Sequence, residues 1–581
     1  MRLALAPINP TVGDIDGNAA LIAAGIDKAR AAGADIVVFP ELALCGYPPR
    51  DLVMMEGFVP ACAAAAKALG ESRTKGITAV FGVPLPVDAD RPGGSIRGRA
   101  TVANSLVIYR NNRFVDSYDK RLLPTYDVFD EDRYFEPGDR SVTIDISGKS
   151  SIRAGFAICE DLWKGEDAGF ASRYHAAPDP VAGIIEAGAQ LIISPSASPF
   201  VLGKGEKHRD ILAAHARQHN VYVASVNQLG GNDDLIFDGH AFVYGPGGAL
   251  LAAGRGFGDD QLIFDLPESA PAKDARKGCI LFDEDDRLLF ETLTLGIRDY
   301  LRKTGHKKAI IGVSGGIDSA VTAALAAAAL GPDNVLGVSM PSRYSSEGSK
   351  SDAYELCRRL KVRCETVPIE PPFIGFREII DPAFRALGEP TLGQSMPDIT
   401  EENLQSRVRG TLLMAVSNRT GGLVLTTGNK SELAVGYCTL YGDTNGGLAV
   451  LSDVTKLAVY KLARWMNANH RLCGFENPPI PEATITKPAS AELRPGQKTE
   501  ECLPPYRLID QIIERYVERH QSPSRIAAET RIEPETVQRI VRMIDLAEYK
   551  RKQTAVGLKV TTVAFGAGRR MPIAQRWRPR V

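Results

Sequence analysis

The sequence has no long hydrophobic run and no excess of charge of either sign. No window approaches 18 uninterrupted apolar residues, which is about the length that a membrane-spanning helix needs. The N-terminal segment has no apolar stretch followed by a signal-peptide cleavage site, so we expect a cytoplasmic protein. The formal net charge is −1 over 581 residues. A chain so balanced shows no electrostatic preference for nucleic acid or anionic membrane, and we expect neither as a partner.

Paired ligand patterns are also missing. The nine cysteines include no CxxC pair, which indicates reduced thiols and not a disulfide framework or a zinc site. His215 and His219 have helical i, i+4 spacing, but the glutamate of an HExxH pattern does not lie between them. We therefore interpret this pair as part of a solvated helix face, and any one of the cysteines remains open as a nucleophile.

Short apolar runs alternate with helical patterns in both halves of the chain, which predicts an α/β protein. The helical patterns of the first half include residues 18–32 and 204–219. Two alternating runs around Asn111 and Asn112 predict a hairpin, so the first sheet system should be mixed and not purely parallel. The apolar runs of the first half are RLALAPIN, DIVVFPELAL, ITAVFGVPL, RAGFAICED, AQLIISPSAS and VYVASVNQ.

The alternation pauses after Leu266 and divides the chain. Residues 267–279 are rich in proline, alanine and charge without periodicity, as linkers are. We predict a first domain at 1–265, a linker at 266–285 and a second domain at 286–581. The strand-like runs of the second domain have the rhythm of a doubly wound parallel sheet, and the chain becomes mainly helical from about Tyr506.

Three reactive side chains stand where apolar runs of the first domain end. Cys159 ends RAGFAIC, Glu41 ends DIVVFPE and Lys120 ends FVDSYDK. A lone cysteine at a strand end is more often a packing residue than a nucleophile. With the other two, however, a carboxylate could carry the thiol proton to a leaving amine, and an ammonium could hold a developing oxyanion. Together they predict an amide-cleaving site.

Three ordered motifs of this region resemble the nitrilase superfamily over about the first 265 residues: FPELALCGYPPRD, YDKRLLPTYDVFDEDRYFEPG and ICEDLW. The resemblance implies a four-layer αββα sandwich, with Glu41 as general base, Lys120 as oxyanion stabiliser and Cys159 as nucleophile. SASPFVLGK is similar to the glutamine-holding segment of the glutaminase branch. That likeness implies glutamine contacts for a further set of residues: Tyr126, Glu131, Ser198 and Lys204.

The stretch GVSGGIDSA, residues 312–320, lies between a predicted strand and a predicted helix. A glycine turn there directs backbone N–H groups and the positive end of the helix dipole at one point, which suits an anion. The stretch fits neither GxxxxGK[ST] nor GxGxxG. Ser314 and Ser319 offer hydroxyls instead, and Asp318 offers a carboxylate that is reasonable beside phosphates only when Mg²⁺ is shared.

SGGIDSA resembles the loop of the N-type ATP pyrophosphatases, which adenylate a substrate oxygen. ENLQSRVRG, LTTGNKSE, YGDTNGG and EYKRKQ are similar to segments of NAD synthetases, so the whole chain resembles the glutamine-dependent NAD synthetase family. The likeness implies Asn403, Glu432 and Lys550 at the dinucleotide, with Arg407 and Lys456 as weaker candidates. It implies Mg²⁺ on Asp318, with Glu432 as a second candidate ligand. The implied ATP contacts are Gly312, Val313, Ser314, Gly315, Gly316, Ile317, Asp318, Ser319 and Thr427.

The implied activity is that of a C–N ligase with L-glutamine, deamido-NAD and ATP as substrates. The first domain would release ammonia from glutamine, and the second would adenylate the deamido-NAD carboxylate and amidate it to NAD, releasing pyrophosphate and AMP. Free ammonia is mostly protonated at neutral pH, so we hypothesise an internal tunnel between the sites. The family also implies a homo-oligomer.

Two other interpretations stay open. Pyrophosphatase loops also serve other glutamine-fed amidotransferases, and the identity of the substrate depends on the resemblance alone. Residues 524–544, near the C-terminus, have the pattern of a helix-turn-helix. Lys and Arg nearly balance Asp and Glu across that region, which favours a helical cap on the second domain over a phosphate-binding face.

Overall fold

The computed structural model describes residues 1–87, 101–148, 151–164, 174, 177–266, 284–393 and 397–577. The chain forms two compact units, Met1–Leu288 and Leu289–Val581, and the boundary falls within helix α5 (Asp285–Lys303). The linker predicted at 266–285 lies almost entirely outside the described residues, at 267–283. In the ranges given above, no helix is both long enough and apolar enough to cross a membrane.

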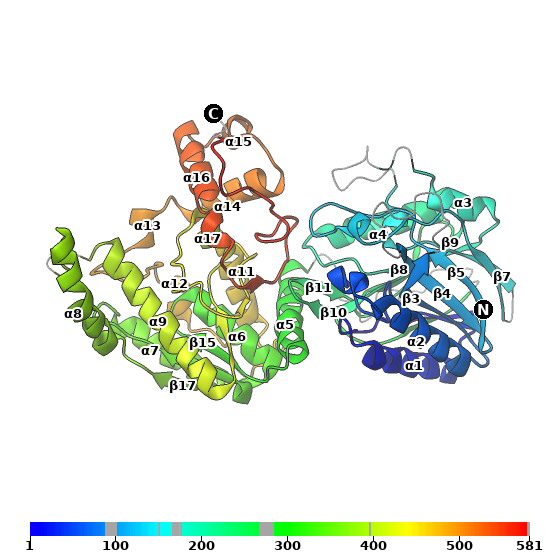
Figure 1. The fold of residues 1–581 in the computed structure, drawn as a ribbon, viewed down its shortest axis with the longest axis horizontal. Helices are drawn as coiled ribbons and strands as arrows, with labels where there is room; N and C mark the ends of the chain where they lie inside the picture. The colour runs from blue at the N-terminus through cyan, green and yellow to red at the C-terminus, as the bar shows by residue number, and fades with distance from the viewer. Residues whose placement is uncertain are drawn as a thin grey trace. The chain divides into compact units, whose positions relative to one another are not determined.

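The first unit is built on two six-stranded sheets (Figure 1). One sheet has the order β14–β1–β2–β3–β4–β5, with β1 (Arg2–Leu5), β2 (Ile36–Val38), β3 (Thr78–Val87), β4 (Thr101–Arg110), β5 (Arg113–Asp119) and β14 (Leu262–Asp265). The other has the order β13–β12–β9–β8–β7–β6, with β6 (Thr143–Ser147), β7 (Ser151–Phe156), β8 (Leu191–Ser196), β9 (Tyr222–Asn227), β12 (Ala241–Tyr244) and β13 (Leu250–Ala253). In both sheets the central strands run parallel and the outer strands antiparallel, so the prediction of mixed sheets is confirmed.

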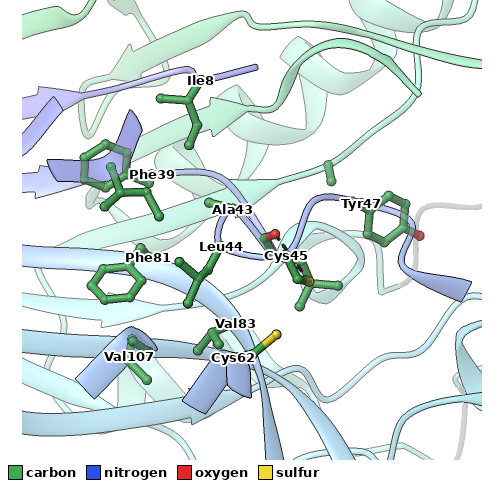
Figure 2. Close-up of a cluster of buried hydrophobic side chains, with 14 of the residues drawn as sticks. Ile8, Phe39, Ala43, Leu44, Cys45, Tyr47, Cys62, Phe81, Val83 and Val107 are labelled. Carbon is green, nitrogen blue, oxygen red and sulfur yellow. Dashed lines mark hydrogen bonds between the residues drawn. The ribbon is translucent and has the colours of Figure 1, made fainter. Parts of the chain in front are cut away.

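Alternating side chains of the strands create two separate cores on the first sheet. Leu5 and Val38 point toward the second sheet and pack with Phe156 and Ile193, which form the centre of the sandwich. The residues that alternate with them, such as Phe39, point outward to the helices, as the two-residue period of a strand requires. Figure 2 shows part of this outer core.

Helices cover the outer face of each sheet. α1 (Ile15–Ala31) and α2 (Phe58–Arg73) pack on the first sheet, while α3 (Pro180–Glu186) and α4 (Lys204–His219) pack on the second. The predicted four-layer αββα sandwich is therefore confirmed. The described residues of this unit also form the short 3-10 helices η1 (Arg50–Met54), η2 (Glu131–Arg133) and η3 (Cys159–Leu162).

The hairpin predicted from the sequence and one further hairpin lie in the first unit. β4 and β5 pair antiparallel across Asn111 and Asn112, whose φ angles of 53° and 59° are those of a tight hairpin turn, so the predicted hairpin is confirmed. A separate hairpin joins β10 (Leu229–Asn232) to β11 (Leu235–Asp238).

The second unit contains one parallel sheet with the order β17–β16–β15–β18–β19–β20. Its strands are β15 (Ala309–Gly312), β16 (Val335–Ser339), β17 (Arg363–Thr366), β18 (Leu423–Thr426), β19 (Leu448–Ala449) and β20 (Val556–Gly557). The strand order reverses between β15 and β18, and ligands of doubly wound sheets bind beyond the carboxyl ends of the strands at such a point. The predicted fold class is confirmed for this unit too.

Helices occupy most of the rest of this unit. Those between the strands are α6 (Ile317–Leu330), η5 (Pro332–Asn334), α7 (Glu347–Leu360), α8 (Glu370–Leu387), α9 (Ile399–Thr420), α10 (Lys430–Val435) and α11 (Lys456–Ala468). The helical C-terminal part comprises α12 (Glu482–Thr486), α13 (Thr499–Cys502), α14 (Tyr506–Ile512), the π-helix η6 (Ile513–Glu518), α15 (Pro523–Thr530), α16 (Pro534–Leu546) and α17 (Glu548–Arg551). Val537, Ile540 and Ile544 of α16 are buried in a cluster with Ile509 of α14, and α16 also contacts α10. The helix-turn-helix pattern thus belongs to a packed helical cap.

A buried lysine ties this cap to the sheet. The Lys430 ammonium is fully buried and lies 2.7 Å from Glu518, at the end of η6, and 3.0 Å from Asp453. The Lys430 ammonium also donates a hydrogen bond to the Thr561 hydroxyl at 2.6 Å. Because burial of a lone charge is very unfavourable, each of these groups depends on the others.

We expect Lys430→Met to lower the free energy of unfolding of the second unit by about 3–5 kcal/mol, because it removes the cation that pairs with the buried Asp453 and the partly buried Glu518. The matched control is Lys361→Met, which removes a largely exposed pair with Glu476 and should change stability by less than about 1 kcal/mol. Urea unfolding of the full chain, followed by fluorescence, measures both. Equal losses in the two variants would contradict the role of Lys430.

Candidate active sites

The first site gathers side chains from the ends of three strands. Glu41 follows β2, Lys120 follows β5, and Cys159 follows β7 and begins η3. Cys159 has a φ of 43°, a region that non-glycine residues enter rarely and that is found at functional sites. All three side chains are buried. The structure therefore brings the three predicted reactive residues together beneath the surface.

Lys120 is held between two carboxylates. Its Nζ donates to Glu41 Oε1 at 2.7 Å and to Glu131 Oε1 at 2.9 Å, and the Tyr47 hydroxyl donates to the same Glu131 oxygen at 2.8 Å. Burial alone would lower the pKa of Lys120, but Glu131 and Glu41 outweigh it and raise this pKa well above its ordinary value. Lys120 is thus a fixed cation at neutral pH. Burial raises the pKa of Glu131 to about 7, against the lowering effect of Lys120.

Glu41 is fixed in orientation by three donors. Besides Lys120, Asn104 Nδ2 donates to Oε1 at 2.7 Å, and the backbone N–H of Ala197 donates to Oε2 at 2.9 Å. Burial and the charge of Glu41 raise the pKa of the Cys159 thiol, although Lys120 lowers it. The thiol is therefore neutral at physiological pH, and its reaction needs a base at hand, which an oriented carboxylate supplies.

Two further residues line the surroundings of the cysteine. Glu160, directly after it, accepts hydrogen bonds from the hydroxyls of Tyr126 at 2.9 Å and Tyr174 at 3.1 Å. Lys204 lies over the ring of Trp163, 5.5 Å from its centroid. Burial raises the pKa of Glu160, while Lys120 and the Tyr126 hydrogen bond lower it. A buried acceptor framed by hydroxyls and an ammonium is a binding surface for a polar, charged ligand.

Two further sets of residues that the sequence singled out belong to this unit. Ser198 and Lys204 line one cavity of about 30 Å³ with Asn227 and Asp238. The rings of His215 and His219, which the sequence pattern assigns to a solvated face, stack at 5.9 Å, and His215 Nε2 lies 2.8 Å from the Leu162 carbonyl oxygen.

Sequence reasoning missed three groups of this site: Tyr47, Asn104 and Glu160. Tyr47 and Glu160 stand inside two of the motifs quoted above, and each could have been found as a polar residue next to a strand-end charge. Asn104 had no such signal, because it lies within β4 and reaches Glu41 only through the folded sheet.

The second site begins at the turn between β15 and α6. The hydroxyl of Ser314 lies 3.2 Å from that of Ser319, which also donates to the Gly316 carbonyl at 2.9 Å, so the turn is closed on itself. Gly315 has a φ of 75°, and a Cβ there would lie 2.3 Å from the Ser349 carbonyl oxygen. Only glycine fits that position.

A pocket of about 490 Å³ opens above this turn, at the carboxyl ends of β15 and β18. This volume is in the range of small-molecule sites. Glu432 and Lys456 line it, together with most of the residues predicted to contact ATP. Those residues are Gly312, Val313, Ser314, Gly316, Ile317, Asp318, Ser319 and Thr427. Gly315 does not line the pocket.

Lys456 joins two carboxylates in this pocket. Its ammonium forms ion pairs with Asp318 and with Glu432, the latter at 3.2 Å. Asn429 Nδ2 donates to the other Asp318 oxygen at 3.0 Å, and the Tyr506 hydroxyl donates to Glu432 at 3.3 Å. Burial raises the pKa of Glu432, which Lys456 lowers and Asp318 raises. Asn429 and Tyr506 were not predicted, although Asn429 stands in the quoted LTTGNKSE.

The remaining predicted residues hold one segment, 436–440, beside the pocket. Lys550 Nζ donates to the carbonyls of Gly436 at 2.8 Å and Cys438 at 2.7 Å. Asn403 accepts from Thr439, and Arg407 Nε donates to the Leu440 carbonyl at 3.2 Å. The structure therefore brings Asn403, Arg407 and Lys550 together, but not onto the wall of the pocket.

Comparison with known proteins gives the same two parts. The carbon-nitrogen hydrolase family matches residues 2–269, and the NAD synthase family matches residues 289–554. The glutamine-dependent NAD(+) synthetase of Synechocystis sp. is 42% identical over 579 residues, which is 99% of each chain. That of Xanthomonas campestris pv. campestris is 41% identical over 580 residues, which cover 99% of this chain and 97% of the relative.

Solved structures agree with these relatives. The glutamine-dependent NAD+ synthetase of Acinetobacter baumannii, solved in complex with adenosine diphosphate, has a TM-score of 0.72 and 35% identity over 98% of each chain. The enzyme of the same name from Cytophaga hutchinsonii has a TM-score of 0.79 over 99% of this chain and 98% of its own, and at 21% identity it shows the shared fold. The chain belongs to the glutamine-dependent NAD(+) synthetase family.

Proposed function

We propose that this enzyme converts deamido-NAD to NAD with ATP and with ammonia that it releases from L-glutamine. The observation that carries the proposal is that one chain holds both a buried Cys159–Glu41–Lys120 site and, in its other unit, a nucleotide-sized pocket over the turn of residues 312–319. Residues 1–265 would serve as the glutamine amidohydrolase domain, and residues 286–581 as the synthetase domain.

In the first domain, Glu41 accepts the thiol proton as Cys159 Sγ attacks the glutamine side-chain carbonyl carbon. Lys120 stabilises the negative charge that develops on the carbonyl oxygen. Glu41 then delivers the proton to the amide nitrogen, ammonia leaves, and a γ-glutamyl thioester remains. A water that Glu41 deprotonates hydrolyses the thioester to glutamate and restores the thiol. Ser198, Lys204 and Tyr126 hold the glutamine, and Glu131 supports Lys120.

In the second domain, a carboxylate oxygen of deamido-NAD attacks the α-phosphorus of ATP and displaces pyrophosphate. Backbone N–H groups of the 312–319 turn and the N-terminus of α6 receive the leaving pyrophosphate, with Thr427 as a further ATP contact. Ammonia adds to the carbonyl of the resulting adenylate and displaces AMP. Glu432 contacts the dinucleotide, whereas Asn403 and Lys550 act on it indirectly, through segment 436–440, which they hold in place.

The carboxylates of Asp318 and Glu432 fit a magnesium ion. Both already contact one cation, the Lys456 ammonium, and carboxylate oxygens are the ligands that Mg²⁺ prefers. When bound, Mg²⁺ would neutralise charge on the phosphates of ATP. When no magnesium ion is bound, the Lys456 ammonium offsets the repulsion between the two carboxylates.

The first test separates the two nitrogen sources. We expect Cys159→Ala to abolish NAD formation from glutamine and to leave NAD formation from ammonium within about 2-fold of wild type, because only the thioester step needs the thiol. Cys62→Ala, in the outer core of the same unit, is the matched control and should keep both activities. Glutamine-driven NAD formation by Cys159→Ala would refute the nucleophile, and a wild type inactive with both donors would refute the function.

The second test removes the proposed metal ligand. We expect Asp318→Asn to reduce AMP formation from ATP and deamido-NAD by about 100-fold or more, with either nitrogen donor, and to raise the Mg²⁺ concentration needed for half activity. Chelation of Mg²⁺ with EDTA should abolish the wild-type reaction. Asp333→Asn, at an exposed carboxylate of η5, is the control. An unchanged Mg²⁺ titration in Asp318→Asn would contradict its role.

We further propose that the enzyme self-associates through the outer face of α8. Phe373 is the one residue of this 18-residue helix that is fully buried, whereas Ile379 and Leu387 are 78% and 74% exposed and share a face with the exposed Phe376. We infer that the same stripe of a second copy covers it across a two-fold axis, which is the commonest arrangement of homo-oligomers.

We expect Ile379→Glu to weaken self-association of the full chain at least 10-fold, because it buries a charge in the apolar stripe. Leu21→Glu, at an exposed leucine of α1, is the control. Sedimentation velocity measures both variants, and wild-type association by Ile379→Glu would contradict the interface.

A further inference from the structure

Asn227 holds the backbone of Ser198 at both of its polar groups. The Ser198 N–H donates to Asn227 Oδ1 at 2.8 Å, and Asn227 Nδ2 donates to the Ser198 carbonyl at 2.9 Å. Ser198 lies just after β8, and Asn227 is the last residue of β9. These strands are parallel neighbours, with Ser196 of β8 in register with Asn227. The segment that leaves β8 is therefore fixed in place by one buried side-chain amide.

Asp238 determines which way this amide points. Its Oδ1 accepts a second hydrogen bond from Asn227 Nδ2 at 2.9 Å and one from the His240 backbone N–H at 3.1 Å. Its Oδ2 lies 3.1 Å from His240 Nδ1. An ionised carboxylate accepts only, so it can be satisfied only by the NH₂ end of Asn227, and the oxygen end must then face the Ser198 N–H.

Asp238 stays ionised in this environment. Burial alone would raise its pKa, but the contact with His240 and the hydrogen bonds from Asn227 and the His240 amide lower it to about 2. The carboxylate therefore remains an acceptor at every pH at which the enzyme is expected to work.

The Ala197–Ser198 segment connects Glu41 with the proposed glutamine-binding residues. Ala197, one residue before Ser198, donates its N–H to Glu41 Oε2 at 2.9 Å. On the other side, Ser198 and Lys204 line the same cavity as Asn227 and Asp238. A shift of the Ser198 peptide would therefore displace the orienting donor of Glu41 as well as a proposed glutamine ligand.

We propose that Asp238 and Asn227 are positioning residues for the glutamine reaction, with Asp238 acting through Asn227 on the Ala197–Ser198 segment. The inference depends on the proposed use of glutamine at Cys159. Neither residue needs to touch glutamine. They keep the glutamine pocket and the base Glu41 in one fixed geometry. A small displacement caused by a mutation at Asp238 or Asn227 would therefore slow the reaction at Cys159.

The test replaces the carboxylate with an amide of the same shape. In Asp238→Asn one acceptor oxygen becomes an NH₂ donor, so Asn227 loses the constraint on its orientation. We expect kcat/KM for glutamine hydrolysis to fall about 10- to 100-fold, with KM raised through Ser198 and kcat lowered through Glu41. NAD formation from ammonium, which uses the other unit, should stay within about 2-fold of wild type.

A double-mutant cycle then asks whether the two residues act in series. Asn227→Ala should show a similar loss, and Asp238→Asn combined with Asn227→Ala should be no worse than Asn227→Ala alone. Asp233→Asn is the matched control, since it alters a largely exposed carboxylate on the same β10–β11 hairpin and should keep wild-type glutamine kinetics. Thermal unfolding of each variant reports whether the first unit is folded at the assay temperature.

Each outcome decides the question. Wild-type glutamine kinetics in a folded Asp238→Asn or Asn227→Ala variant overturns the inference, and so does a combined loss equal to the product of the single losses. If both variants lose activity only because the first unit unfolds below the assay temperature, the residues stabilise and do not position, which also overturns it. A wild type that hydrolyses no glutamine would instead refute the proposed function.

Discussion

A buried ammonium remains charged only when anions surround it, and three of the buried lysines in the described residues each lie between two carboxylates. Lys120 lies between Glu41 and Glu131, Lys456 between Asp318 and Glu432, and Lys430 between Asp453 and Glu518. Removing a charge from water is unfavourable by several kcal/mol, so these clusters exist only where the backbone delivers every member to the same point. Two of the three clusters are the candidate active sites, and the third anchors the helical cap beside one of them.

The ends of parallel strands make this delivery possible. Strands that run in the same direction release their following residues at one edge of the sheet, so residues distant in sequence converge there. In the first unit, the carboxyl ends of β2 in one sheet and of β7 and β8 in the other meet at the site, where Glu41 accepts a hydrogen bond from the backbone N–H of Ala197. In the second unit, the edge where β15 and β18 diverge carries the closed serine turn and the pocket above it. Polar residues behind these edges, such as Asp238, hold the segments that the sites depend on.

Much of this arrangement was predictable from local patterns. The apolar runs located the central strands, Asn111 and Asn112 located a hairpin, and the strand-end positions of Glu41, Lys120 and Cys159 singled out residues that do meet in the structure. The glycine loop was recognised for the same reason, because its residues are contiguous. Asn104 and Tyr506 could not be found in this way. Each is an ordinary polar residue whose partner lies at least 63 positions away, and nothing in its own neighbourhood distinguishes it.

The sequence by itself determined the two-part α/β organisation, the strand-end positions of Glu41, Lys120 and Cys159, and the glycine turn between a strand and a helix, because periodicity and contiguous motifs depend only on neighbouring residues. Only the tertiary structure decided how the charges pair, that Lys550 and Asn403 hold segment 436–440 and do not line the pocket, and that Asn227 and Asp238 stand behind Ser198. These features depend on strand register and on which side chains face one another across the sheets. Register is a property of the packed sheet as a whole, and no local stretch of sequence encodes it.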